Sequence, residues 1–171
     1  MTSPPGQVVI VDGSSVTTPQ VFAWTPNSAR TLNVTTPQGA GPTRYAFDHW
    51  SQGGSKSQTV TAPATATTYT ALLSAQYQIT TSTSLDGYYT DGSQVRLTAT
   101  AASNYTHTNF SGDLTGSTNP QTLTLSSPKS VNANFTAKPK SLVSSVSGTS
   151  LGPERTTPIR DRLSRKCGVA W

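Results

Sequence analysis

The sequence predicts an all-β fold: two tandem small antiparallel β-repeat units (β-grasp-like or sandwich-like), followed by a disordered C-terminal tail. Three observations predict it. Polar and apolar residues alternate over runs of five to eight residues. Asp-Gly dipeptides and prolines separate these runs. Segments of the chain recur about 60 residues later. The composition agrees, because 53 of the 171 residues are Ser or Thr, and 13 Gly and 12 Pro oppose long helices.

The expected strands follow one another about every ten residues, a spacing typical of antiparallel sheets. In the clearest case Val95, Leu97 and Ala99 point to one face and the intervening polar residues to the other. The turn dipeptides Asp12-Gly13 and Asp91-Gly92 tolerate the positive φ of tight turns. We expect strands at residues 7–11, 20–24, 29–36, 44–50, 57–62, 67–73, 76–82, 93–101, 105–111, 120–126 and 129–136.

The internal repeat sets the expected domain organisation. Residues 45–51 match residues 105–111 at an offset of 60, and residues 58–61 match 121–124. Each unit has about 65 residues and a thin core, so its aromatic rings supply most of the burial. We expect a disordered N-terminus (1–6), unit 1 (7–74), unit 2 (75–137) and a flexible basic tail (138–171). The expected core rings are Tyr45, Phe47, Trp50, Tyr69, Tyr105, Phe110 and Phe135.

The charge is concentrated at the C-terminal end. Residues 1–137 carry five basic and five acidic side chains, whereas residues 138–171 carry seven basic and two acidic ones. Nothing in the neutral body therefore suggests a nucleic-acid partner, and no apolar run is long enough for a membrane span. The single cysteine, Cys167, excludes a disulfide scaffold and is taken as a free thiol.

Residues 45–54, with rings at 45, 47 and 50 followed by Gly53-Gly54, continue into residues 60–63 and 67–71. Together they resemble the divergent internalin-B-type B-repeat of bacterial surface proteins. Residues 110–135 are similar to the same family, as a second tandem copy. Two positions depart from its pattern: His107 replaces an aromatic residue, and Leu72-Leu73 replaces Asn-Phe.

The resemblance implies small β-rich units in secreted or surface-anchored bacterial proteins. It implies a non-catalytic module that acts as a spacer or adhesion element of a larger protein. Residues 1–6 show no signal peptide, so the expectation of extracellular or cell-surface placement rests on the resemblance to the family. The partner is unknown from the sequence, and the candidates are a glycan and a host or neighbouring surface protein.

Enzymatic chemistry finds no support in the residue pattern. Asp48 and His49 are adjacent, so on a strand their side chains point to opposite faces. His49, His107 and Cys167 lie in separate segments without the paired spacing of a metal site. We therefore expect no catalytic residues, no metal and no cofactor.

A carbohydrate-binding module is the alternative function. Exposed rings stack on sugar faces, and β modules often present such rings in loops. Tyr88 and Tyr89 fall in an expected loop, and Trp24 ends an expected strand beside Pro26. These three rings are the candidate glycan contacts. The simpler interpretation is that Tyr88 or Tyr89 packs over the sheet edge and that Trp24 caps the first unit.

Overall fold

The computed structural model describes residues 1–82 and 86–140, and in these residues all regular structure is β. The all-β fold with antiparallel sheets is thereby confirmed. The strands are β1 (Thr2–Ser3), β2 (Val8–Val11), β3 (Ser14–Thr17), β4 (Ala29–Asn33), β5 (Thr43–Trp50), β6 (Gln58–Thr61), β7 (Ala71–Thr81), β8 (Gly87–Thr90), β9 (Gln94–Leu97), β10 (Tyr105–Gly112), β11 (Gln121–Thr124) and β12 (Lys129–Ala137).

Three sheets connect these strands. A four-stranded sheet has the order β3-β2-β4-β6, and β9 pairs with β11 in a two-stranded sheet. The third sheet has six strands, of which β7 contacts four: β1, β5, β8 and β12. Two of its pairings, β1 with β7 and β12 with β7, are parallel, whereas the others are antiparallel.

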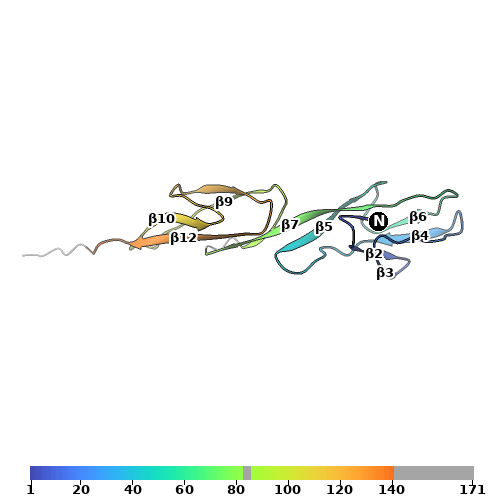
Figure 1. The fold of residues 1–171 in the computed structure, drawn as a ribbon, viewed down its shortest axis with the longest axis horizontal. Coiled ribbons are helices and arrows are strands. Elements are labelled where there is room, and N and C mark those ends of the chain that lie inside the picture. Colours follow the sequence, from blue (N-terminus) through green and yellow to red (C-terminus); the bar gives the residue numbers. More distant parts are fainter. Residues whose placement is uncertain (83–85, 141–171) are drawn as a thin grey trace, which may run out of the picture. The chain divides into compact units, whose positions relative to one another are not determined.

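Strand β7 belongs to both repeats (Figure 1). Gln76 pairs with Arg44 of β5 and with Thr90 of β8, so β5 and β8 lie on opposite edges of β7. Ile79 pairs with β8 and with β12, which places β12 on the same edge as β5. Each edge of β7 therefore carries one strand of the first repeat and one strand of the second.

The two repeats share their strand pairing as well as their sequence pattern. Trp50 pairs with Ala71, and Phe110, 60 residues after Trp50, pairs with Ala133. The β5–β7 ladder shifts register between Phe47 and His49, and the β10–β12 ladder shifts at the corresponding positions 107 and 109. An equivalent bulge at equivalent positions shows that the internal repeat is structural.

Each repeat has its own hydrophobic core. The first core contains Trp50 at 2 % exposure, and Tyr45, Phe47 and Tyr69 pack half-buried against it. The second core contains Phe110, also 2 % exposed. The other fully or largely buried members are Val9, Val11, Leu32, Val34, Ala71 and Leu73 in the first repeat, and Ile79, Val95, Leu97, Ala99, Leu125 and Val131 in the second.

Two of the expected core rings are instead exposed. Tyr105 and Phe135 are 46 % and 38 % exposed, so this part of the expectation was wrong. For Tyr105, the cause is a shorter connection before β10. Thirteen positions separate Leu32 from Tyr45, whereas eight separate the equivalent Leu97 from Tyr105. In the first repeat the longer loop pairs Gln38 with Tyr45, and the second repeat lacks these five residues.

The strand predictions were wrong at four places. Residues 20–24 form no strand, because Pro19 and Pro26 flank the segment and proline cannot donate to a ladder. Strand β3, at Ser14–Thr17, was not expected. The two strands expected at 67–73 and 76–82 are the single strand β7. Tyr88 and Tyr89 form strand β8 rather than a loop.

The expected disorder of residues 1–6 was also wrong. Thr2 and Ser3 pair with Ala71 and Leu72, and the buried Thr2 hydroxyl hydrogen-bonds the hydroxyl of Thr18. This pairing places β1 on the free edge of β7. The predicted flexible tail lies outside the described residues from position 141 onwards, as does Cys167.

Gly112 lies where β10 approaches β12, and we expect alanine there to destabilise the second repeat. Its φ is +95°, and an added Cβ would lie 2.4 Å from the Ser130 carbonyl oxygen. The left-handed conformation alone costs about 1–2 kcal/mol, and the contact requires the backbone to shift as well. Gly92→Ala is the matched control, because Gly92 has a φ of +78° and open space around it. Equal losses for both variants in urea unfolding would contradict the expected contact.

Candidate functional site

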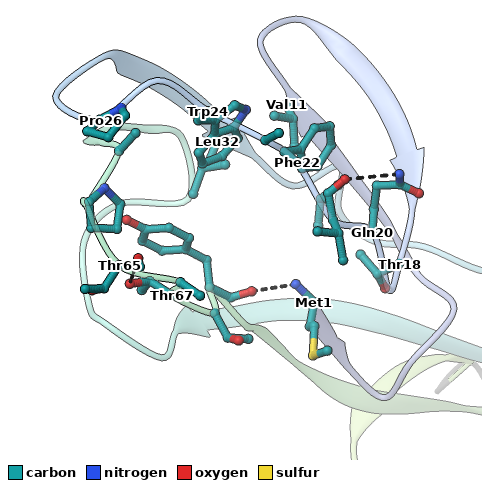
Figure 2. A pocket seen from close by; sticks show the side chains of 18 of the residues that line it. Met1, Val11, Thr18, Gln20, Phe22, Trp24, Pro26, Leu32, Thr65 and Thr67 are labelled. Carbon is teal, nitrogen blue, oxygen red and sulfur yellow. Dashed lines mark hydrogen bonds between the residues drawn. The ribbon is translucent and has the colours of Figure 1, made fainter.

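The first repeat contains a cleft of about 500 Å³, a volume within the range of ligand sites. Figure 2 shows Phe22 and Trp24 on one side of the cleft and Thr65 and Thr67 on the other. The buried residues that line the cleft are Val9, Val11, Leu32, Trp50, Thr18 and Ala62. The cleft therefore combines an apolar lining with hydroxyl groups at its side.

The two segments that border the cleft have few backbone hydrogen bonds: the Val21 carbonyl accepts from the Gln20 side chain at 3.4 Å and the Thr65 carbonyl from the Thr67 hydroxyl at 3.2 Å. Within the described residues, neither 20–24 nor 64–68 makes a backbone-to-backbone hydrogen bond. Beyond these segments, the Ala62 carbonyl accepts from Asn27 N–H at 2.8 Å, and the Met1 amine donates to the Tyr69 carbonyl. The prolines at 19, 26 and 63 explain this arrangement, because they interrupt strand pairing at both segments.

The rings at the cleft pack on one another. Phe22 stacks on Trp24 with the ring centroids 5.4 Å apart, and the Arg30 guanidinium carbon lies 5.5 Å from the centroid of Trp24. Val21 is nevertheless 89 % exposed and Phe22 39 % exposed. Trp24, one of the predicted glycan contacts, thus lies half-buried at the cleft with its ring already in contact with two neighbours.

Among the described residues that line the cleft, none carries a carboxylate, imidazole, guanidinium or ammonium side chain. The α-amino group of Met1 lies at the cleft, and partial burial lowers the pKa of that group below its usual range. The described lining is thus made of apolar and neutral polar side chains.

Asp12 lies in the turn between β2 and β3, and its carboxylate links this turn to strand β4. Its Oδ1 accepts from Thr31 N–H at 2.9 Å, and its Oδ2 accepts from Arg30 at 3.0 Å. The backbone hydrogen bond from Thr31 is the largest cause that lowers the pKa of Asp12, and Arg30 lowers it further.

This pKa predicts a pH-dependent stability. A carboxylate whose pKa is lowered by folding stabilises the fold above its unfolded pKa, and this stabilisation is lost as the pH falls through the folded pKa. Asp12→Asn should lower the Tm at neutral pH, and the difference from wild type should shrink below about pH 4. Asn tolerates the φ of 48° at this position, so the variant isolates the charge. Thermal unfolding across pH measures the difference, and a constant difference would contradict the assignment.

The other two predicted glycan contacts lie in the second repeat, on β8, and the structure does not bring them to Trp24. Tyr89 packs against the second core. The Tyr88 hydroxyl donates to the Gly41 carbonyl at 2.7 Å, and the Arg44 guanidinium carbon lies 3.9 Å from the Tyr88 ring centroid. Arg44 also donates to Gln76 Oε1 at 2.8 Å. Tyr88 therefore joins the two repeats, a role that its sequence position did not reveal.

The candidate acid–base residues lie at the surface. His49 Nδ1 is 3.0 Å from Asp48 Oδ2, and both side chains are more than half exposed. The expectation that the two side chains point to opposite faces was therefore wrong, because the register shift between Phe47 and His49 interrupts the alternation of the strand. Among the described residues, no group of three His, Cys, Asp or Glu residues gathers in a way that could hold a metal ion.

His107 occupies the place that Phe47 has in the first repeat. Its ring lies 4.7 Å from that of Phe110 and 5.8 Å from that of Phe135, measured between centroids. The His107 Nε2 is buried and has no hydrogen-bond partner among the described residues. His107 thus acts as an aromatic packing residue of the second core.

The shared strand, the repeated register and the two separate cores define an all-β tandem-repeat module. Within it, residues 73–139 match the family model of the divergent InlB B-repeat domain. The match begins inside β7 and extends past the end of β12. No curated protein and no solved structure matches the chain. No helix of the described residues is long and apolar enough to cross a membrane.

Proposed function

We propose that the chain is a non-catalytic, extracellular or cell-surface repeat module that serves as a spacer or adhesion element of a larger bacterial protein. The observation that carries this proposal is the sharing of β7 between the repeats. To separate the repeats, the ladders of β7 with β8 and β12 must break, together with the contacts of Tyr88 to Gly41 and Arg44. Such a joint suits a module that holds two points of a surface protein apart.

The surface composition supports the same proposal. The described part of the chain up to residue 137 has equal numbers of basic and acidic side chains, and its exposed strand faces are rich in Thr and Ser. Hydroxyl groups keep such a surface hydrated without attracting polyanions. The match of residues 73–139 to the divergent InlB B-repeat domain supports placement at the bacterial surface.

Force spectroscopy on the full chain, held at its two ends, tests the load-bearing role. We expect a discrete unfolding event whose length gain corresponds to both repeats, about 400–450 Å. This is the extended length of residues 1–138, about 450–500 Å, less the roughly 50 Å that the folded strands already span. An unstructured Gly/Ser chain of the same length is the control. Smooth extension indistinguishable from that control would overturn the spacer role.

The carbohydrate alternative would place a sugar on Trp24, Tyr88 or Tyr89. The contacts of Trp24 with Phe22 and of Tyr88 with Arg44 count against it, because a sugar needs a free ring face. A glycan array with the full chain and a Tyr88→Ala/Tyr89→Ala variant separates the two functions. Tyr89 packs against the second core and Tyr88 joins the repeats, so specific binding would favour the alternative only if it disappears in a variant whose urea midpoint is unchanged.

A further inference from the structure

We propose that the cleft of the first repeat binds residues 141–151 of a second copy of this chain, so that copies associate head to tail. The proposal goes beyond a spacer role and does not depend on it. It rests on the few backbone hydrogen bonds at the cleft, on the neutral lining, and on the length and composition of the chain that follows Lys140.

The cleft has the features of a strand-addition site. Residues 20–24 and 64–68 border it with backbone groups that make no backbone-to-backbone hydrogen bond within the described part of the chain. An added peptide strand gains its affinity from such groups, and apolar pockets between them select its side chains. The lining of Val9, Val11, Leu32 and Trp50 supplies an apolar floor for these side chains.

The chemistry of the cleft selects one segment of the chain. Thirty-one residues follow Lys140, and their first eleven, SLVSSVSGTSL, contain no charged residue and no proline. Leu142, Val143, Val146 and Leu151 provide apolar side chains among serines. Residues 152–171 fit poorly, because they include two prolines and seven charged side chains.

The strand register shows that this segment must come from another molecule. β7 runs eight residues from Ala71, near the cleft, to Ile79, which pairs with Lys129 in parallel. β12 then continues eight residues to Ala137. These two stretches place Ala137 roughly 50 Å from Ala71 along the strand direction. The fourteen residues from Ala137 to Leu151 span at most about 50 Å when fully extended, so none of them remains to occupy the cleft of the same copy.

A contact between two different surfaces of identical chains is heterologous, and it extends into open chains rather than closed dimers. This property allows a complementation experiment on the full-length chain. Thr67→Arg places a charge in the cleft at an exposed position, and Val146→Asp places one in the tail segment. Thr122→Arg makes the same exchange at an exposed strand position of the second repeat, away from the cleft, and is the matched control.

Sedimentation measures the outcome. We expect the mass of the wild type and of Thr122→Arg to rise with concentration above the 17.9 kDa monomer, and each of the other two variants to remain monomeric. An equimolar mixture of Thr67→Arg and Val146→Asp should form dimers and nothing larger, since one intact cleft meets one intact tail. A wild type that stays monomeric up to millimolar concentration, or association unchanged in Thr67→Arg, would overturn the proposal.

A synthetic peptide of residues 141–151 tests the occupant directly. In a Trp171→Phe background the remaining tryptophans, Trp24 and Trp50, both line the cleft, so their fluorescence reports its occupancy. We expect the peptide to change this fluorescence and to dissociate the assemblies, and a Val146→Asp peptide to do neither. If the peptide has no effect while a neutral oligosaccharide changes the fluorescence, the cleft is a sugar site and the proposal is wrong.

Discussion

Replacement of Trp50 by alanine should lower the free energy of unfolding of the first repeat by about 3–5 kcal/mol, the usual cost of deleting a large buried ring. Trp50 is 2 % exposed, and its indole Nε1–H donates to the Lys56 carbonyl at 3.2 Å. The ring of Phe47 packs on it with the centroids 6.0 Å apart. A repeat this small has few other large side chains that could fill the space.

Trp24→Ala is the matched control, because Trp24 is the other tryptophan of the same repeat and is half-buried beside the cleft. Its removal exposes apolar lining without opening an enclosed cavity, so we expect a clearly smaller loss. Urea unfolding followed by far-ultraviolet circular dichroism measures both variants. Similar losses for both would mean that Trp50 is not the centre of the first core.

The side-chain pattern predicted the strands that are bounded by turns on both sides. Alternation and Asp-Gly turns placed β2, β9 and β11 within a few residues, because each pairs locally around a turn or presents one face to the core. The repeat predicted the equivalence of β5 and β10, since the rings of both strands recur at a fixed offset.

Features that depend on distant segments could not be predicted in this way. β1 has two residues and forms because the edge of β7 is free beside it, which no local pattern reveals. The small and polar residues Ser74 and Ala75 suggest a boundary, yet β7 continues through them because β5 and β8 pair with it on both sides. The exposure of Tyr105 follows from a loop that is five residues shorter in the second repeat.

The cleft is another feature that local sequence patterns could not predict. The pattern at residues 20–24 is that of a strand, and the flanking prolines were the signal against it. The pairing of β4 with β6 brings the connection before β4 close to the connection after β6. Residues 20–24 therefore face residues 64–68 across the apolar lining of the cleft, and no local sequence pattern shows this. Sequence identified Trp24 as a candidate contact but not the site to which it belongs.

Phe110→Ala in the second repeat should destabilise the first repeat as well. Phe110 is 2 % exposed in the second core, and its loss should cost about 3–5 kcal/mol. When the second core opens, β7 loses its pairing with β8 and β12, and the C-terminal half of the strand that supports β5 is no longer held. The two repeats should therefore unfold in one cooperative transition.

Two probes of the same urea titration measure this coupling. In a Trp171→Phe background, fluorescence reports Trp24 and Trp50 of the first repeat, while circular dichroism reports the strands of both. We expect Phe110→Ala to lower both midpoints together, and Tyr105→Ala, on the same strand but 46 % exposed, to leave both nearly unchanged. A fluorescence midpoint that does not move with Phe110→Ala would show that the repeats unfold independently. In that case β7 would link two separate modules instead of joining them into one load-bearing unit.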